Sequence, residues 1–405
     1  MPASIPYDPS LTLMSVVNDK ALTAVEEISK AQDPVYAAKD SLDSLIASKR
    51  SLEMTKTELK NLGVGTDALD TELTKLSNAI LQSAADHEKA KVLAEPKIQQ
   101  LRAAMRNSQV QFESPVDGLR SGIKTLPLAS NTMNMNVQYF SVGSDQQTSA
   151  VYVSQIASYV SGTMSRIFGP SEYTSIGTAA ANQVAQELKR QNLEGTLVIS
   201  VCCTHQNVSM VAPFVLNLDK AVKIWNELFP GNKLDPTSRS DMMKVAMGER
   251  NADKYSIISG TTFGSGFVGM VHAVKTSDAS AAEDLTGAAT SLQATIDAGS
   301  WYNGTDRRKG LDSSFDENIR RLFSEQNVQS NATVLTMGVG SGDATTPAPS
   351  GGLDVGAMLQ ALDDYLKKMA ASTGGTPLHH YLKDIDKKSL AEQLIAKYYP
   401  GKCEE

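Results

Sequence analysis

Six residues in the second half of the chain match a nucleotide-binding pattern. Gly264-Ser265-Gly266-Phe267-Val268-Gly269 has the spacing G-x-G-x-x-G, and Glu283 or Asp284 follows at about the distance that would reach a ribose. In that motif a helix begins at the glycines, but the residues up to Val274 are β-branched and aromatic and include no N-cap. The segment is therefore predicted to be a strand whose glycines allow a bulge or close packing, and no cofactor is predicted.

Cysteine and histidine supply the other candidate chemistry. Cys203 and His205 would share one face of a strand, and His272, His379 and His380 are the histidines that could join them in a metal or Cys-His site. Their spacing is not diagnostic, and buried cysteines are usually unreactive. No metal ligand or catalytic residue is therefore assigned, and enzymatic activity is left uncertain, with the balance against it.

The location is inferred from the cysteines and the first residues. Cys202 and Cys203 are adjacent in an apolar run, where their side chains would point to opposite faces of a strand and could not pair. The first 15 residues lack the basic and apolar regions of a secretory signal. These features favour a reducing compartment, and we expect a cytoplasmic protein.

The most informative pattern is the absence of charge from four long runs. Charged residues make up 20% of the chain, so each run should contain about four. The runs that contain none are residues 125–144, 195–218, 255–274 and 326–342. Alternation such as Leu197, Ile199 and Val201 predicts that each run forms one strand or a strand pair. Because solvated strand faces normally carry charges, both faces are expected to be covered by helices or by another subunit.

Helical periodicity dominates the N-terminal third. Leucine, isoleucine and methionine recur at near-heptad spacing over about residues 40–106, and Gly63 and Gly65 divide this stretch into the two helices of an antiparallel hairpin. An earlier amphipathic stretch is expected to end near Pro34. Lys49 and Lys56 interrupt the apolar seam, which favours a hairpin that rests on other elements over a long coiled coil.

These elements predict an α+β fold. An N-terminal helical hairpin region packs on a mostly antiparallel sheet of about six strands that is covered by helices, and a helical tail follows. The predicted divisions are residues 1–114 for the helical region, 115–342 for the α+β domain, 343–352 for a Pro/Gly linker and 353–405 for C-terminal helices.

Two classes of function fit this organisation. The net charge of −7 argues against nucleic acid as a partner. The first hypothesis is a non-enzymatic structural or interaction protein that forms homo-oligomers through charge-free surfaces. Residues 125–165 contain a single charged side chain, Asp145, and Ile156 and Val160 are the candidate contact residues.

The second hypothesis is a membrane-active or pore-forming protein. It would have the helical hairpin as its body and residues 255–274 as an inserting tongue, because this run is uncharged over about the length that spans a bilayer. Its serines, threonines and glycines make it too polar for a spanning helix, so a buried sheet is favoured. An enzyme whose pocket gathers residues distant in sequence is a further alternative.

Overall fold

A computed structural model describes most of the chain. The described residues are 4–8, 11–109, 112–127, 133–142, 148–249, 253–274, 281–305, 308–325, 329–338, 346–347, 353–371 and 375–399. The helices are α1 (Asp19–Asn61), α2 (Asp67–Gln109), α3 (Thr148–Met164), α4 (Pro170–Arg190), α5 (Leu218–Leu228), α6 (Arg239–Met247), α7 (Ala281–Asp297), α8 (Ser313–Glu325), α9 (Val355–Ala371) and α10 (Lys387–Tyr398). The strands are β1 (Ser4–Pro6), β2 (Val16–Val17), β3 (Ile123–Pro127), β4 (Met133–Ser141), β5 (Leu193–Val211), β6 (Lys254–Val274), β7 (Tyr302–Thr305), β8 (Arg308–Leu311), β9 (Ser330–Met337), β10 (Thr346–Pro347) and β11 (Thr376–Asp386).

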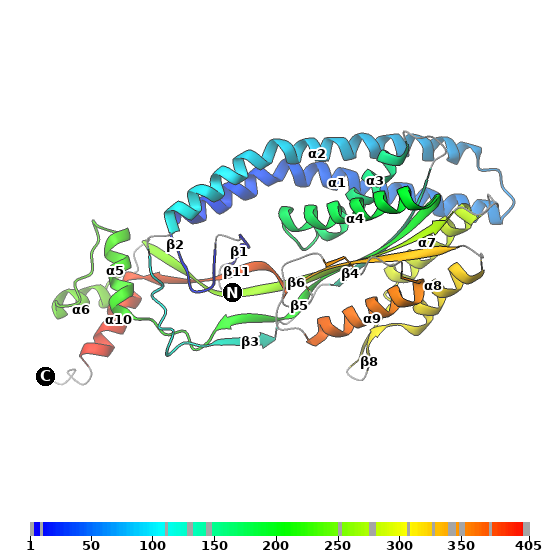
Figure 1. Ribbon diagram of the computed structural model, residues 1–405. Helices are drawn as coiled ribbons and strands as arrows, with labels where there is room; N and C mark the ends of the chain where they lie inside the picture. Colours follow the sequence, from blue (N-terminus) through cyan, green and yellow to red (C-terminus); the bar gives the residue numbers. More distant parts are fainter. Residues whose placement is uncertain are drawn as a thin grey trace.

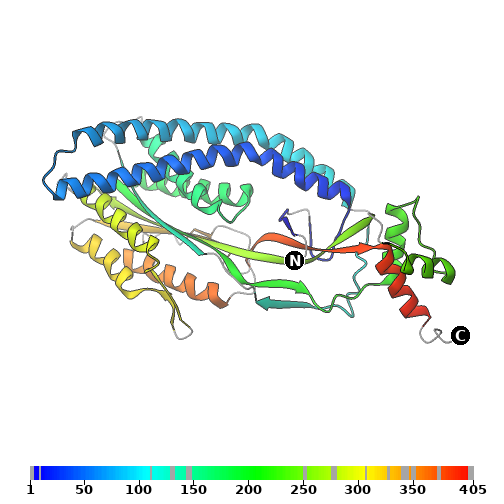
Figure 2. The same cartoon turned by 180° about the vertical axis from the view of Figure 1, so that it is seen from behind.

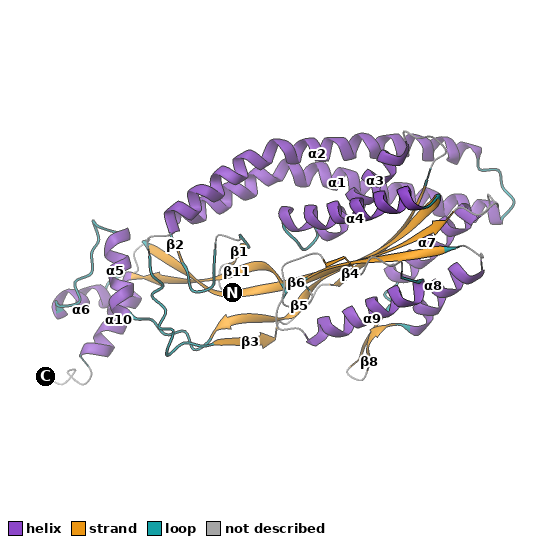
Figure 3. Cartoon of the chain, in the orientation of Figure 1, coloured by secondary structure: helices purple, strands orange, loops and turns teal. Residues whose placement is uncertain are grey.

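One curled antiparallel sheet runs along the elongated molecule (Figures 1 and 3). Its centre is the pair β5 and β6, of 19 and 21 residues, which pair antiparallel from Leu193↔Val274 to Met210↔Gly260 with register shifts after Leu193 and after Thr204. At one end of this pair the sheet continues into β4 on β5 and β9 on β6. At the other end β3 joins β5, and β11 joins β6 and carries β1. The two long strands therefore connect two differently built halves of one sheet.

Helices cover both faces of the half that contains β4 and β9. The hairpin of α1 and α2 lies outermost on one side, with α3 and α4 between it and the sheet (Figure 1). Seen from behind, α7, α8 and α9 lie on the opposite side of the sheet (Figure 2). Alternate residues of β5 serve the two sides: Leu197 and Ile199 pack toward α7, α8 and α9, whereas Val198 packs toward α3 and α4. This period of two explains why these strands lack a charged face.

A smaller group of helices, α5, α6 and α10, packs at the end of the molecule nearest the C-terminus (Figure 1). Trp225 of α5 is fully buried there, and its Nε1 donates to the backbone oxygen of Asn232 at 2.8 Å. This cluster closes the end of the sheet that lies away from α3 and α7.

The predicted α+β fold, with a helical hairpin and a helix-covered antiparallel sheet, is confirmed. The first helix is longer than expected, because α1 continues through Pro34 instead of ending there. Proline removes one helical hydrogen bond, but Ile28 and Val35 on either side of it are both buried. Packing on both sides of Pro34 therefore outweighs the local preference.

The sheet and the C-terminal region also differ from the prediction. Within the described residues the sheet has nine strands, not about six, since short strands at its edges carry little sequence signal. The region predicted as C-terminal helices contains β11, in which Leu378, His380 and Leu382 are buried and alternate with less buried neighbours. Most of the predicted linker at 343–352 lies outside the described residues, and its described part forms β10 against β9.

Candidate functional site: helices inserted between paired strands

Two of the helical segments are the connections between neighbouring antiparallel strands. β4 and β5 pair from Met133↔Cys203 to Ser141↔Gly195, and the chain between them forms α3 and α4. β6 and β9 pair from Gly266↔Met337 to Ala273↔Ser330, and the chain between them contains α7, the β7/β8 hairpin and α8. Each insert therefore occupies the place of the turn in a long β-hairpin.

The charge-free helix α3 is largely buried within the chain, and Ser154 is the exposed position among its described side chains. It lies between the sheet and the α1/α2 hairpin, and Tyr152, Ile156, Val160 and Met164 are at most 2% exposed. Ile156 and Val160, the candidate contact residues of a homo-oligomer, belong to the core shared by α3, α4 and the sheet. The missing charges are thus explained by cover from the same chain, and they no longer argue for a subunit interface.

A chain of polar contacts ties α3 to three strands. The Tyr152 hydroxyl donates to Thr196 Oγ1 on β5 at 2.6 Å, and this oxygen lies 2.9 Å from His272 Nδ1 on β6. His272 Nε2 is in turn 3.2 Å from Thr333 Oγ1 on β9. Burial lowers the pKa of His272 to about 4, so its ring is neutral at pH 7. These contacts link α3 to β5, β6 and β9 through a neutral His272 ring.

The glycines of the G-x-G-x-x-G pattern lie within the central strand β6, where their lack of a side chain lets helices pack closely on both faces of the strand. A Cβ at Gly266 would stand 2.8 Å from Met164 Sδ of α3, and one at Gly269 would stand 2.6 Å from Met358 Sδ of α9. No helix begins at these glycines. The segment is a glycine-bearing strand used for close packing, as predicted. The side chains of Glu283 and Asp284 lie outside the described residues.

Cys203 and His205 do meet, through a serine that the sequence did not single out. Ser265 Oγ lies 3.5 Å from Cys203 Sγ and 3.2 Å from His205 Nε2, and also 3.2 Å from the Tyr365 hydroxyl of α9. Ser265 is fully buried and His205 is 1% exposed. The cavity beside Arg102 and the cavity beside Gln155 are not lined by this group, and its burial makes it a polar network of the core.

The remaining histidines lie elsewhere. His380 Nδ1 is 2.9 Å from Thr261 Oγ1 on β6, and Tyr7 packs against its ring at 5.3 Å. His379 is exposed on the neighbouring position of β11. The five candidate residues therefore do not form one site, and among the described residues no cluster of three or more His, Cys, Asp or Glu side chains could hold a metal ion.

One edge of the sheet is closed by a helix. β4 pairs with β5 alone among the described strands, and on its other side the buried backbone amide of Val137 donates to Gln293 Oε1 of α7 at 2.7 Å. A side chain thus takes the place that a further strand would occupy.

Within the described part of the chain, no helix has both the length and the apolar character needed to cross a bilayer. The sequence matches no protein-family model and no curated protein.

Among solved structures, the chain shows weak likeness to a non-hemolytic pneumolysin from Streptococcus pneumoniae, at 10% identity and a TM-score of 0.22, covering 74% of this chain and 46% of that one. A second likeness is to the human-specific toxin intermedilysin, at 11% identity and a TM-score of 0.22, covering 65% of this chain and 41% of that one. The chain thus spans less than half the length of either structure.

Proposed function

We propose that the chain is a membrane-active protein that stores its lipid-contacting segment as the buried helix α3. The observation that carries the proposal is a charge-free, strand-prone segment that is folded as a helix between two paired strands. Its lack of charge matters because ionised side chains in a bilayer are costly.

The composition of α3 opposes its helical conformation. Eight of its 17 residues are threonine, valine, isoleucine or tyrosine, and serines and a glycine make up much of the rest. β-Branched and aromatic residues favour strands, and serine and glycine are poor helix formers. The helix is therefore maintained by its cover, and its local preference is satisfied if the segment becomes extended.

The connectivity gives an extended α3 a place to go. β4 leads into α3, and β4 already pairs with β5 up to Ser141↔Gly195. If the insert becomes extended, the β4/β5 hairpin grows longer and keeps its register. Strand pairing then supplies the backbone hydrogen bonds that lipid cannot supply. Residues 255–274, the tongue of the second hypothesis, form the central strand β6, which has partners along both edges, in line with the buried sheet that the sequence favoured. We therefore assign the role of inserting segment to α3.

Self-association belongs to the same proposal. A lengthened hairpin in lipid still has two edges with unpaired backbone N–H and C=O groups. Only pairing with further strands, in a closed sheet, supplies hydrogen bonds to these groups. The edge of β4 that Gln293 now covers is one that a second copy would occupy. We also propose that the protein is stored in the cytoplasm, since Cys202 and Cys203 are free, buried thiols.

Dye release from phospholipid vesicles tests the proposal with three lysine variants. Ser154 is exposed on α3 and Gln155 is half-buried, so Ser154→Lys and Gln155→Lys leave the stored fold intact. Neighbouring residues of a strand point to opposite faces, so one of the two lysines would face lipid, at a cost of about 2–4 kcal/mol.

We expect release by the unchanged chain and by the control Ser48→Lys, on the exposed side of α1, and a large loss in one α3 variant. Equal release by all three variants, or no release by the unchanged chain from any vesicle, contradicts the proposal.

A further inference from the structure

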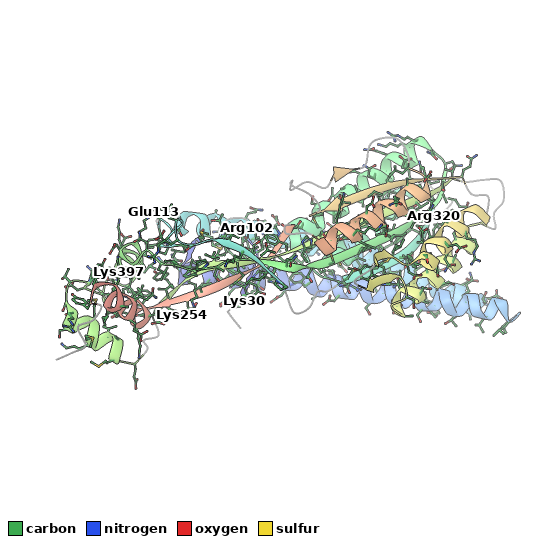
Figure 4. All side chains as sticks on the ribbon, turned by 90° about the horizontal axis from the view of Figure 1, so that it is seen from below. Lys30, Arg102, Glu113, Lys254, Arg320 and Lys397 are labelled. Atoms are coloured by element: carbon green, nitrogen blue, oxygen red, sulfur yellow. The ribbon has the colours of Figure 1, made fainter. Side chains whose placement is uncertain are left out.

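A cavity of about 240 Å³ lies where four parts of the chain meet. Its walls come from the N-terminal residues that follow β1, from the α1/α2 hairpin, from the turn between α3 and α4, and from the start of β11. Arg102 of α2, which lines the cavity, lies toward the middle of the elongated molecule (Figure 4). An occupant would therefore touch the hairpin, the α3 insert and the sheet at once.

One side of the cavity offers hydrogen-bond donors. Arg102 Nε donates to Asp8 Oδ2 at 2.8 Å, and the two side chains are 16% and 5% exposed. Among the described residues, the two terminal nitrogens of Arg102 make no further hydrogen bond. Gln32 of α1 is 8% exposed and makes no hydrogen bond to a residue that the structure describes. A guanidinium edge and a buried amide thus face the same small space, and both can donate to an anion.

The other side is suited to a cation. Glu172, in the first turn of α4, lines the cavity together with the aromatic rings of Tyr7, Tyr36 and Phe168. Glu172 lies close enough to Tyr36 to contribute, after burial and Asp33, to raising the pKa of that hydroxyl. Aromatic faces beside a carboxylate attract an ammonium group that cannot itself donate hydrogen bonds.

The balance of charge selects among ligands. The cavity holds two carboxylates, Asp8 and Glu172, against one guanidinium, Arg102, so it does not favour a ligand with net negative charge. A ligand with one anionic and one cationic group matches both sides.

We propose that this cavity binds a choline phosphodiester, with the phosphate at Arg102 and Gln32 and the quaternary ammonium at Glu172 and the three rings. The same chemistry occurs in a soluble diester and in the headgroup of a phosphatidylcholine lipid. Binding of the soluble diester does not require that the chain acts on membranes, so this inference goes beyond the proposed function and can succeed or fail separately. Because the ligand bridges the hairpin and the turn after α3, it stabilises the stored form.

Isothermal titration calorimetry with the full chain tests the inference. The probes are glycerophosphocholine, which carries both charges, and choline and glycerol 3-phosphate, which carry one kind each. We expect glycerophosphocholine to bind about tenfold more tightly than either single-charge probe.

Two variants each remove one polar group, one from the cation side of the cavity and one from the anion side. Glu172→Gln and Gln32→Leu should each weaken binding of glycerophosphocholine by about tenfold, and the control Glu72→Gln, an exposed change on α2, should leave it unchanged. Thermal unfolding of each variant checks its fold, and the second variant decides the matter if the first does not fold. No binding to the unchanged chain, or binding by both folded cavity variants that is as tight as that of the unchanged chain, overturns the inference.

Vesicles distinguish the two sources of the ligand. Competition by phosphatidylcholine vesicles, but not by phosphatidylglycerol vesicles, supports the lipid headgroup as the natural ligand. Binding of the diester without such competition supports a soluble diester in the same cavity.

Discussion

Acidification is expected to destabilise the protein through three buried histidines. His205, His272 and His380 are at most 2% exposed, and burial lowers the pKa of each to about 4. Their observed partners are the hydroxyls of Ser265, of Thr196 and Thr333, and of Thr261. In the unfolded chain the same rings have a pKa near 6.5. The stability that they contribute is therefore complete above about pH 6.5 and is lost as the pH falls toward 4, because the unfolded chain takes up protons first.

The size of the effect follows from these values. Between pH 7 and pH 5, each histidine should reduce the free energy of unfolding by about 2 kcal/mol, and the three together by about 6 kcal/mol. That is a large part of the about 5–15 kcal/mol by which folded domains are usually stable. Carboxylates add little in this range: the lowered pKa of Asp384 makes its contribution fall only below about pH 4.

Urea unfolding followed by circular dichroism at pH 7, 6 and 5 measures the effect. Replacing His272 with glutamine keeps a neutral side chain and should remove about a third of the pH dependence. A free energy of unfolding that is unchanged between pH 7 and pH 5, or a full pH dependence in the His272→Gln variant, would refute the assignment of these rings as buried neutral groups.

Three further changes test the packing by urea unfolding. Ile156→Glu should unfold the chain or cost more than about 3 kcal/mol, since it places a charge in a core position, and a folded but dissociated protein would contradict this. Gly264→Ala should cost about 1–3 kcal/mol because its Cβ would stand 2.8 Å from the backbone oxygen of Cys203, whereas Gly65→Ala, with open space around it, should be neutral. Gln293→Leu should cost about 1–3 kcal/mol because it leaves the outer-edge amide of β4 without a partner, and an unchanged stability would show that water replaces the bond.

The sequence predicted the layers of the fold better than their topology. Charge-free runs such as 195–218 and 255–274 indicated covered strands, and they are the two central strands β5 and β6. The runs did not reveal that each forms one long strand, because period-two alternation is the same in one strand and in a pair. The edge strands were missed because pairing partners, not composition, define strands such as β10, of two residues.

The candidate site was harder to predict than the fold. Cys203 and His205 were correctly placed on one face, but Ser265 and Tyr365, which complete their network, come from β6 and α9. Contacts between residues so far apart in sequence leave no local spacing to detect. The cavity at Arg102 could not be predicted for the same reason, since its polar residues come from four separate segments of the chain.

The environment of α3 on vesicles shows whether this helix is the segment that enters lipid. A fluorophore is attached to Ser154→Cys or, in a second chain, to Gln155→Cys, each with Cys403→Ser; position 154 of α3 is exposed and position 155 is half-buried in the stored form. During dye release from phospholipid vesicles we expect the emission of one of the two labels to shift as in an apolar medium and to be quenched by lipids with nitroxide-labelled acyl chains. The same label at Ser48→Cys on α1 should stay in water. Dye release with an aqueous label at both position 154 and position 155 would contradict the assignment of α3 as the inserting segment.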